Sequence, residues 1–137
     1  MKKNPKNYDV LIIGAGPAGA NAAISYKNLN PNLTVALVDK ATFPRDKSCG
    51  DAIGPGVITA LKRFNNEHIL DGEPQVVSTT LYGPDNIGIQ NYIPEVKNKE
   101  DSIVYVIPRL DLDNRILNLA KESGVDVYEG YSFVDFT

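Results

Sequence analysis

The fold is decided by the stretch VLIIGAGPAGANAA, which runs from Val10 to Ala23. From Tyr8 to Ile13 the chain is a short apolar and β-branched run, which is typical of a buried strand, and Gly14 ends it. From Pro17 to about Asn28 the chain is rich in alanine, a strong helix former, and proline is favoured in the first turn of a helix. The stretch therefore predicts a strand, a glycine-rich turn and a helix.

The glycines of this turn follow the pattern Gly-x-Gly-x-x-Gly at Gly14, Gly16 and Gly19. Alone the pattern is weak evidence, but here it lies between a predicted strand and a predicted helix, where a dinucleotide-binding loop belongs. We expect Gly14 to permit the tight turn, Gly16 to let the backbone approach a pyrophosphate, and Gly19 to let helix and strand pack closely. The free amides at the helix start would bind the diphosphate.

A second buried strand is predicted in LTVALVDK, residues 33–40, which completes a β-α-β unit over residues 8–40. This strand ends on Asp39, whose carboxylate is placed to accept hydrogen bonds from the ribose hydroxyls of an adenosine and to repel a 2′-phosphate. The alternative to this ribose-binding role is that Asp39 caps a helix or is an ordinary acidic residue on the surface. In the β-α-β context we expect an ADP-containing dinucleotide, either NAD or FAD, which the glycines do not distinguish.

Beyond this unit the chain alternates between loops, strands and helices. Residues 41–54 are expected to form a long loop, and Pro55 to open a helix that ends near Phe64. VSTTLYGPDNIGIQNY, residues 77–92, predicts a hairpin that turns at residues 83–86. A polar excursion over residues 93–102 then leads to a strand at residues 103–108.

A third helix follows, with Asp111 able to cap its start and Gly124 able to close its end. Its apolar residues have helical spacing: Leu112, Ile116, Leu119 and Ala120. VDVYEG and YSFVDF, residues 125–130 and 131–136, then predict two short strands.

This order of elements predicts an α/β protein with a doubly wound, Rossmann-like sheet and a small antiparallel β insertion. The expected segments are the β-α-β core at 8–40, a loop and helix at 41–66, the β insertion at 76–107 and a strand-helix-strand segment at 103–136. Because the chain stops just after a predicted strand, with no closing helix, we expect it to be a fragment of a longer protein.

Net charge and cysteine content limit the partners and the compartment that we expect for this protein. A net charge of −3 and a pI near 5.1 give no reason to expect nucleic acid as a partner. The single cysteine, Cys49, cannot form an internal disulfide, which fits a cytoplasmic protein.

The basic N-terminus imitates a signal peptide, but the glycine spacing explains the apolar stretch better. No apolar run approaches the roughly 20 residues of a membrane span. The lone His68 has no partner histidine or second cysteine for a metal site.

Three stretches together resemble the N-terminal third of flavoproteins of the geranylgeranyl reductase family, within the wider flavin-monooxygenase-like superfamily of hydroxylases and halogenases. They are YDVLIIGAGPAGANAA, VALVDKATFPRDKSCGDAIGPG and YVIPRLDLDNRILNLAKESGVDVYEG. The resemblance implies the three-layer ββα fold that binds FAD or NAD(P), here incomplete, because the remaining segments of the FAD domain and the substrate domain are expected to be absent. It also implies FAD as the cofactor and NAD(P)H as the electron donor.

Carried over position by position, the resemblance implies that the glycine loop meets the pyrophosphate and Asp39 the ribose. The FPRDKSCGD loop, residues 43–51, would cross beside the flavin ring. Arg109 would reach the phosphate or ribityl region, and Phe133 the adenine end. The implied cofactor-binding residues are Gly14, Gly16, Pro17, Ala18, Gly19, Asp39, Lys40, Arg45, Cys49, Gly50, Ala52, Arg109 and Phe133.

Two of these residues have open alternatives. Positive charge from Arg45 and Lys47 could lower the pKa of the Cys49 thiol and suit an anionic flavin, which makes Cys49 a candidate catalytic residue. Cys49 could equally be a small space-filler against the flavin. Arg109 could instead form a surface ion pair with Asp111 or Asp113.

The resemblance implies an FAD-dependent oxidoreductase that reduces double bonds of a prenyl chain, with a small apolar substrate as partner. The flavin-dependent monooxygenases and halogenases are the alternative enzyme class, and an FAD-binding fragment without activity is the alternative for the isolated chain. A prenyl substrate leaves peripheral contact with a membrane open, although this stretch has no amphipathic basic helix.

Overall fold

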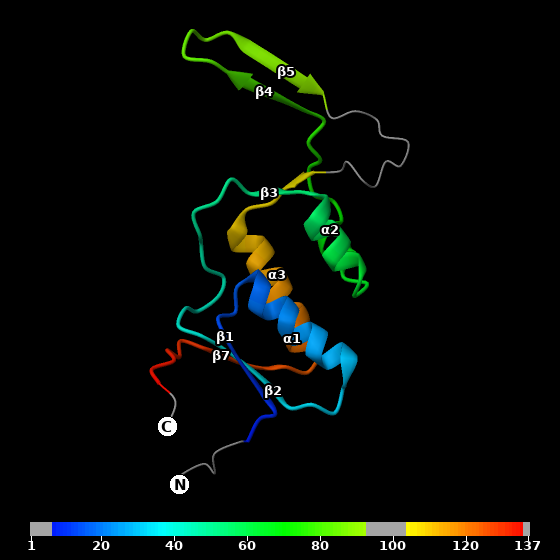
Figure 1. Cartoon of the computed structure of the whole chain (residues 1–137), viewed down its shortest axis with the longest axis vertical. Helices are drawn as coiled ribbons and strands as arrows, with labels where there is room; N and C mark the ends of the chain where they lie inside the picture. The colour runs from blue at the N-terminus through cyan, green and yellow to red at the C-terminus, as the bar shows by residue number, and fades with distance from the viewer. Residues whose placement is uncertain (1–6, 93–103, 136–137) are drawn as a thin grey trace. The chain divides into compact units, whose positions relative to one another are not determined.

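The computed structural model describes residues 7–92 and 104–135 (Figure 1). The chain divides into two compact units. The first unit contains Met1–Ser48 and Arg109–Thr137, and the second contains Cys49–Pro108.

The first unit is built on a three-stranded parallel sheet. Its strands are β1 (Val10–Ile13), β2 (Val35–Asp39) and β7 (Asp126–Glu129), in the order β1-β2-β7. Because all three strands are parallel, their carboxyl ends lie at one edge of the sheet, where ligands bind in doubly wound folds. The predicted β-α-β unit and α/β fold class are confirmed.

Two helices belong to this unit, α1 (Pro17–Leu29) and α3 (Arg109–Glu122), and they lie side by side in Figure 1. α1 packs against β1, β2 and α3. Alanines on the packing face of α1 let the helix lie close to these neighbours, because an alanine side chain has little volume. The buried core of the unit includes Ala20, Ala23, Ile24, Val35, Leu37, Leu112, Ile116, Leu117 and Ala120.

The strand β1 is less buried than the sequence suggested. Leu11 and Ile13 are about half exposed, at 51% and 50%, while Val10 and Ile12 are intermediate. Among the described residues β1 pairs only with β2, and α1 covers one face of it, so alternate side chains face outward. The central strand β2 is buried along most of its length.

The helix α3 starts at Arg109, so Asp111 lies inside its first turn rather than before it. Its end agrees with the prediction for Gly124: the Gly124 amide donates to the Lys121 carbonyl, and the next amide along the chain donates to the Ala120 carbonyl.

The second strand predicted after this helix is wrong over the part that the structure describes, because residues 131–135 form no strand. After β7 the Gly130 amide donates to the Ala41 carbonyl, and the Tyr131 amide donates to the Asp39 carbonyl at 2.9 Å. These bonds turn the chain across the carboxyl end of β2, and it leaves the sheet. Phe136 lies outside the described residues.

The second unit combines short strands and helices. Its elements are β3 (Ala52–Ile53), α2 (Pro55–Lys62), the 3₁₀ helix η1 (Glu67–Leu70), β4 (Ser78–Tyr82), β5 (Gly88–Tyr92) and β6 (Tyr105–Val106). β3 pairs with β6, so the segment predicted as a loop over 41–54 contains a short strand. The polar excursion predicted at 93–102 lies outside the described residues.

The predicted hairpin is confirmed. β4 and β5 are antiparallel, with Leu81 opposite Ile89. The turn is closed by the Asn86 amide, which donates to the Gly83 carbonyl at 2.9 Å.

The two longest helices, α1 and α3, contain 13 and 14 residues. Within residues 7–92 and 104–135, no helix combines the length and the hydrophobicity needed to cross a membrane.

Candidate nucleotide-binding site

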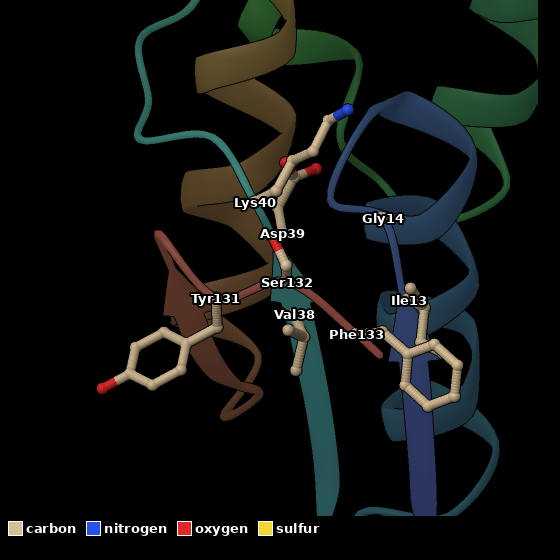
Figure 2. Close-up of a pocket in the computed structure, with 8 residues that line it drawn as sticks. All are labelled: Ile13, Gly14, Val38, Asp39, Lys40, Tyr131, Ser132 and Phe133. Carbon is tan, nitrogen blue, oxygen red and sulfur yellow. The ribbon is translucent and has the colours of Figure 1, made fainter. Parts of the chain in front are cut away.

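A pocket of about 410 Å³ lies in the first unit at the carboxyl ends of β1 and β2 (Figure 2). It is lined by Ile13, Gly14, Val38, Asp39, Lys40, Tyr131, Ser132 and Phe133. Four of these are residues that the sequence nominated: Gly14, Asp39, Lys40 and Phe133. The pocket thus brings together the glycine loop, the acid that ends β2 and the aromatic residue expected at the adenine end.

The glycine loop has the local geometry that the sequence predicted for two of its glycines. Gly14 has a φ of +100°, a backbone conformation that is strained for any residue with a side chain. Its amide donates a hydrogen bond to the Val38 carbonyl at 2.7 Å. A Cβ atom on Gly19 would lie 1.8 Å from the Gly14 carbonyl oxygen. No side chain fits there, so Gly19 is what lets α1 start directly against the turn.

Asp39 joins β2 to the glycine loop. Its carboxylate accepts hydrogen bonds from the Ala15 amide at 2.7 Å and from the Ala41 amide at 2.8 Å, and the residue is only 8% exposed. A carboxylate offers about four acceptor positions, so two backbone amides leave capacity for further donors. The side chain therefore has a structural role that the sequence did not predict, and it can still accept hydrogen bonds from a ligand.

The amino end of α1 begins beside this pocket, with Gly16 as its N-cap and Pro17 in its first turn. The first turn contains no acidic residue, and Gly16 has no side chain to offer the amides of Ala18 and Gly19. These amides are the groups that bind phosphates at helix starts.

Two arginines meet at one buried carboxylate in this unit. Asp113 is 0% exposed and accepts two hydrogen bonds from Arg109, from Nε at 2.6 Å and from Nη2 at 2.8 Å. Arg45 Nη2 lies 3.8 Å from Asp113 Oδ2. Arg109 therefore forms an ion pair with Asp113, as the alternative interpretation expected. The Asp113 carboxylate is fully buried, so this is not a surface ion pair.

An aromatic cluster supports one wall of the pocket. Tyr131 packs edge-to-face on Tyr128, with ring centroids 5.9 Å apart, and Tyr128 packs in the same way on Tyr8 at 6.2 Å. The Tyr8 and Tyr128 hydroxyls are hydrogen-bonded to each other. Burial, together with this bond, raises the pKa of Tyr8 above its ordinary value.

Glu129, at the end of β7, fixes the chain that follows β2. Its carboxylate accepts hydrogen bonds from the Phe43 amide at 2.6 Å and from Lys121 Nζ at 2.8 Å. Burial alone would raise the pKa of Glu129, but these bonds and the Lys121 charge outweigh it, and the pKa lies below its ordinary value.

Three nominated residues lie in the second unit. Cys49 and Gly50 are exposed, and Ala52 pairs with Val106 between β3 and β6. Their contact with a flavin stays a prediction.

Sequence reasoning did not nominate two residues that line the pocket, Tyr131 and Ser132. It named Asp113 only as one of two possible partners of Arg109 in a surface ion pair. The spacing of Arg109 and Asp113, four residues apart on a helix, was a usable signal, because such pairs face each other. Tyr131 and Ser132 were assigned to a strand, so their position beside the end of β2 was not expected.

No protein-family model matches the chain. Menaquinone reductase from Mycolicibacterium smegmatis is 33% identical over 129 residues, which are 94% of this chain and 30% of that protein. Digeranylgeranylglycerophospholipid reductase from Picrophilus torridus is 29% identical over 124 residues, 89% of this chain and 30% of that protein. The chain thus spans about a third of the length of these relatives.

Solved structures show the same fold. The geranylgeranyl bacteriochlorophyll reductase-like protein from Thermoplasma acidophilum matches with a TM-score of 0.70 at 25% identity, over 90% of this chain and 30% of that one. CmlS, a flavin-dependent halogenase, matches with a TM-score of 0.72 at 25% identity, over 93% of this chain and 23% of that one. The chain is therefore similar, over most of its own length, to flavin-dependent reductases and halogenases, and it shares their fold.

Proposed function

We propose that the chain binds FAD at the pocket of the first unit and that the whole protein is an FAD-dependent oxidoreductase. The observation that carries the proposal is the pocket itself, which lies at the carboxyl ends of parallel strands between Gly14 and Asp39. This is where doubly wound folds bind dinucleotides.

The lining of the pocket fits the adenosine half of FAD. Ile13, Val38 and Phe133 supply apolar surface for the adenine, and in Figure 2 the Phe133 ring lies beside Ile13. Asp39 supplies the acceptors for ribose hydroxyls, since its carboxylate is buried and only partly used by backbone amides. Lys40 brings a positive charge to the same wall.

The start of α1 would hold the pyrophosphate. Gly16 is the N-cap of this helix, and Pro17, Ala18 and Gly19 are its first residues. The dipole of the helix favours negative charge there by about 0.3–1 kcal/mol per charge. From the resemblance we further propose that Arg109 contacts the cofactor and that the segment of Cys49, Gly50 and Ala52 lies along the flavin. When bound, FAD supplies the transfer of hydride or electrons, and the protein supplies its position and electrostatics.

For the whole protein we propose the reduction of carbon–carbon double bonds in a prenyl chain, with NAD(P)H as the electron donor. Two similarities support this choice: the digeranylgeranylglycerophospholipid reductase and the geranylgeranyl bacteriochlorophyll reductase-like protein. Prenyl lipids are apolar small molecules, so the proposal includes an apolar substrate.

The second candidate is an FAD-dependent monooxygenase or halogenase, and the match to CmlS favours it. The two candidates differ in their use of oxygen. NAD(P)H oxidation coupled to oxygen consumption would support the second, whereas a saturated product formed without oxygen would support the reductase. For the isolated chain, cofactor binding without turnover is a third outcome, because it spans about a third of its relatives.

Cofactor titrations test the proposal directly. FAD binding is followed by the quenching of flavin fluorescence, and ADP and NAD⁺ are added as competitors. We expect FAD to bind and ADP to displace it, because both place a diphosphate and an adenosine in the same pocket. Absence of FAD binding, or FAD binding that ADP does not reduce, would contradict the proposal.

A further inference from the structure

Asp113 lies between two guanidinium groups and is sealed from solvent. Both of its oxygens accept hydrogen bonds from Arg109, and Oδ2 also lies 3.8 Å from Arg45 Nη2. The Asp113 carboxylate therefore faces two guanidinium groups. Arg109 already satisfies the carboxylate geometrically in the bidentate form that is strongest for such pairs.

The second arginine is held in one place. The Arg45 guanidinium lies over the Phe43 ring, 4.9 Å from its centroid, and its side chain is 24% exposed. A Cβ atom built on Gly16 would lie 3.4 Å from Arg45 Nη2, so the guanidinium is against the backbone of the α1 N-cap. Asp113 on one side and Phe43 on another thus fix Arg45 next to the glycine loop.

An anion bound at the start of α1 would be attracted by the Arg45 guanidinium as well as by the helix. The amino end of a helix carries a partial positive charge, and a guanidinium beside it adds to that charge. Arg109 already makes the bidentate pair with the buried Asp113 carboxylate, and Arg45 brings a second guanidinium to the same anion. The Arg45 guanidinium lies beside the helix start, where the proposed function puts the diphosphate.

We propose that Asp113 is a positioning residue that holds the Arg45 guanidinium beside the glycine loop, where Arg45 contacts the diphosphate of the bound nucleotide. This inference rests on the proposed binding of a nucleotide at α1. Asp113 itself does not touch the ligand; it acts through Arg45.

A double-mutant cycle in ADP affinity tests the inference, with ADP titrated calorimetrically into the chain and into Arg45→Gln, Asp113→Asn and the double variant. Loss of a charge-assisted contact is expected to weaken ADP binding about tenfold in Arg45→Gln. Asp113→Asn is expected to weaken binding at least as much, because Asp113 also holds Arg109. The double variant is expected to lose less than the product of the two single losses, because part of the effect of Asp113 passes through Arg45. Arg63→Gln, an exposed arginine of the second unit, is the matched control for loss of charge and should bind as the parent does.

If the loss of ADP affinity in the double variant equals the product of the two single losses, the inference is overturned. Such a result would mean that Asp113 affects binding in a way that does not depend on Arg45. A parent chain that binds no ADP would also overturn it. If ADP binds with the coupled losses but FAD does not bind, the FAD assignment fails while the positioning role stands. If FAD and ADP bind and the losses multiply, only the positioning role fails.

A second measurement needs no substitution, in case Asp113→Asn does not fold. Nitrogen relaxation of the Arg45 Nε–H group reports its mobility on the fast timescale. We expect this group to be restricted before ADP is added, because Asp113 and Phe43 hold it. A guanidinium that moves freely in the ligand-free chain would overturn the inference.

Discussion

The Asp39 carboxylate accepts a hydrogen bond of 2.7 Å from the amide of Ala15, in the middle of the glycine loop. The other carboxylate oxygen accepts from the Ala41 amide, so one buried side chain connects the end of β2 to the loop before α1 and to its own following residues. The acid that was expected to bind a sugar thus also shapes the loop that was expected to bind phosphates.

Replacing Asp39 by alanine should therefore affect folding as well as nucleotide binding. Two buried amides would lose a charged acceptor, which costs about 1.5–3 kcal/mol of unfolding free energy. Urea unfolding measures this loss, and FAD titration measures the accompanying loss of affinity. Asp46→Asn is the control at an exposed carboxylate and should change stability by less than about 0.5 kcal/mol. Equal stability of Asp39→Ala and the parent would show that the two amide bonds contribute nothing.

Gly19→Ala should destabilise the first unit, because its Cβ would lie 1.8 Å from the Gly14 carbonyl oxygen, a backbone atom that cannot turn aside. Overpacking of this kind costs about 1–3 kcal/mol and sometimes more. The matched control is Gly56→Ala in α2, where nothing lies within 4 Å and alanine should stabilise the helix by up to about 1 kcal/mol. The midpoints of urea unfolding distinguish the two. Similar midpoints would mean that α1 can move away from the turn at little cost.

Arg109→Ala should leave the buried Asp113 carboxylate without its bidentate partner. Removing one partner of a buried pair costs about 3–5 kcal/mol. The double variant Arg109→Ala with Asp113→Ala should lose less than the sum of the two single losses, because no buried charge is then left unpaired. Denaturant unfolding of all four proteins gives the coupling, and strictly additive losses would argue against the pair. Because Arg109 is proposed to contact the cofactor, Arg109→Ala should also retain less FAD than the parent when the two are compared at equal folded fractions.

Glu129 should make the stability of the first unit depend on pH in the acid range. Its pKa is lowered in the folded state, so its contribution is complete above the ordinary value of 4.5 and is lost as the pH falls through the lower folded value. Unfolding free energies of the parent and of Glu129→Gln, measured from about pH 7 to about pH 3, should therefore converge at low pH. A difference that stays constant over the whole range would exclude this titration as the cause.

Cys49→Ala separates the two interpretations of the only cysteine. In the whole enzyme we expect FAD content to be unchanged, because the cofactor is proposed to be held mainly at the first unit, and turnover to change if the thiol takes part in catalysis. Steady-state kinetics and flavin absorbance measure both. Unchanged kinetics would leave the space-filling interpretation.

The sequence predicted the elements whose signals are local. Strand, glycine turn and helix over residues 8–40 depend on an apolar run, on Gly14 with its positive φ and on Pro17 at the helix start, and each is a property of a few neighbouring residues. The hairpin over 77–92 was predictable for the same reason, because its turn residues and flanking β-branched runs are adjacent in the chain.

The errors arose where a segment's structure depends on its contacts with parts of the chain that are distant in sequence. Residues 131–135 have the composition of a strand, but the Tyr131 amide bonds to the Asp39 carbonyl, and the chain crosses the end of β2 and leaves the sheet. The burial of β1 was overestimated because it depends on which elements cover each face, and no local pattern reports that.

By itself, the sequence determined the β-α-β unit, the glycine loop and the acid at the end of the second strand, since these follow from backbone preferences and spacing. Only the tertiary structure decided that Asp39 also bonds to the glycine loop, that Tyr131 lines the pocket and that Asp113 lies between Arg45 and Arg109. The reason is physical: hydrogen bonds and ion pairs between residues far apart in the chain depend on how the elements pack, and packing is a property of the whole unit.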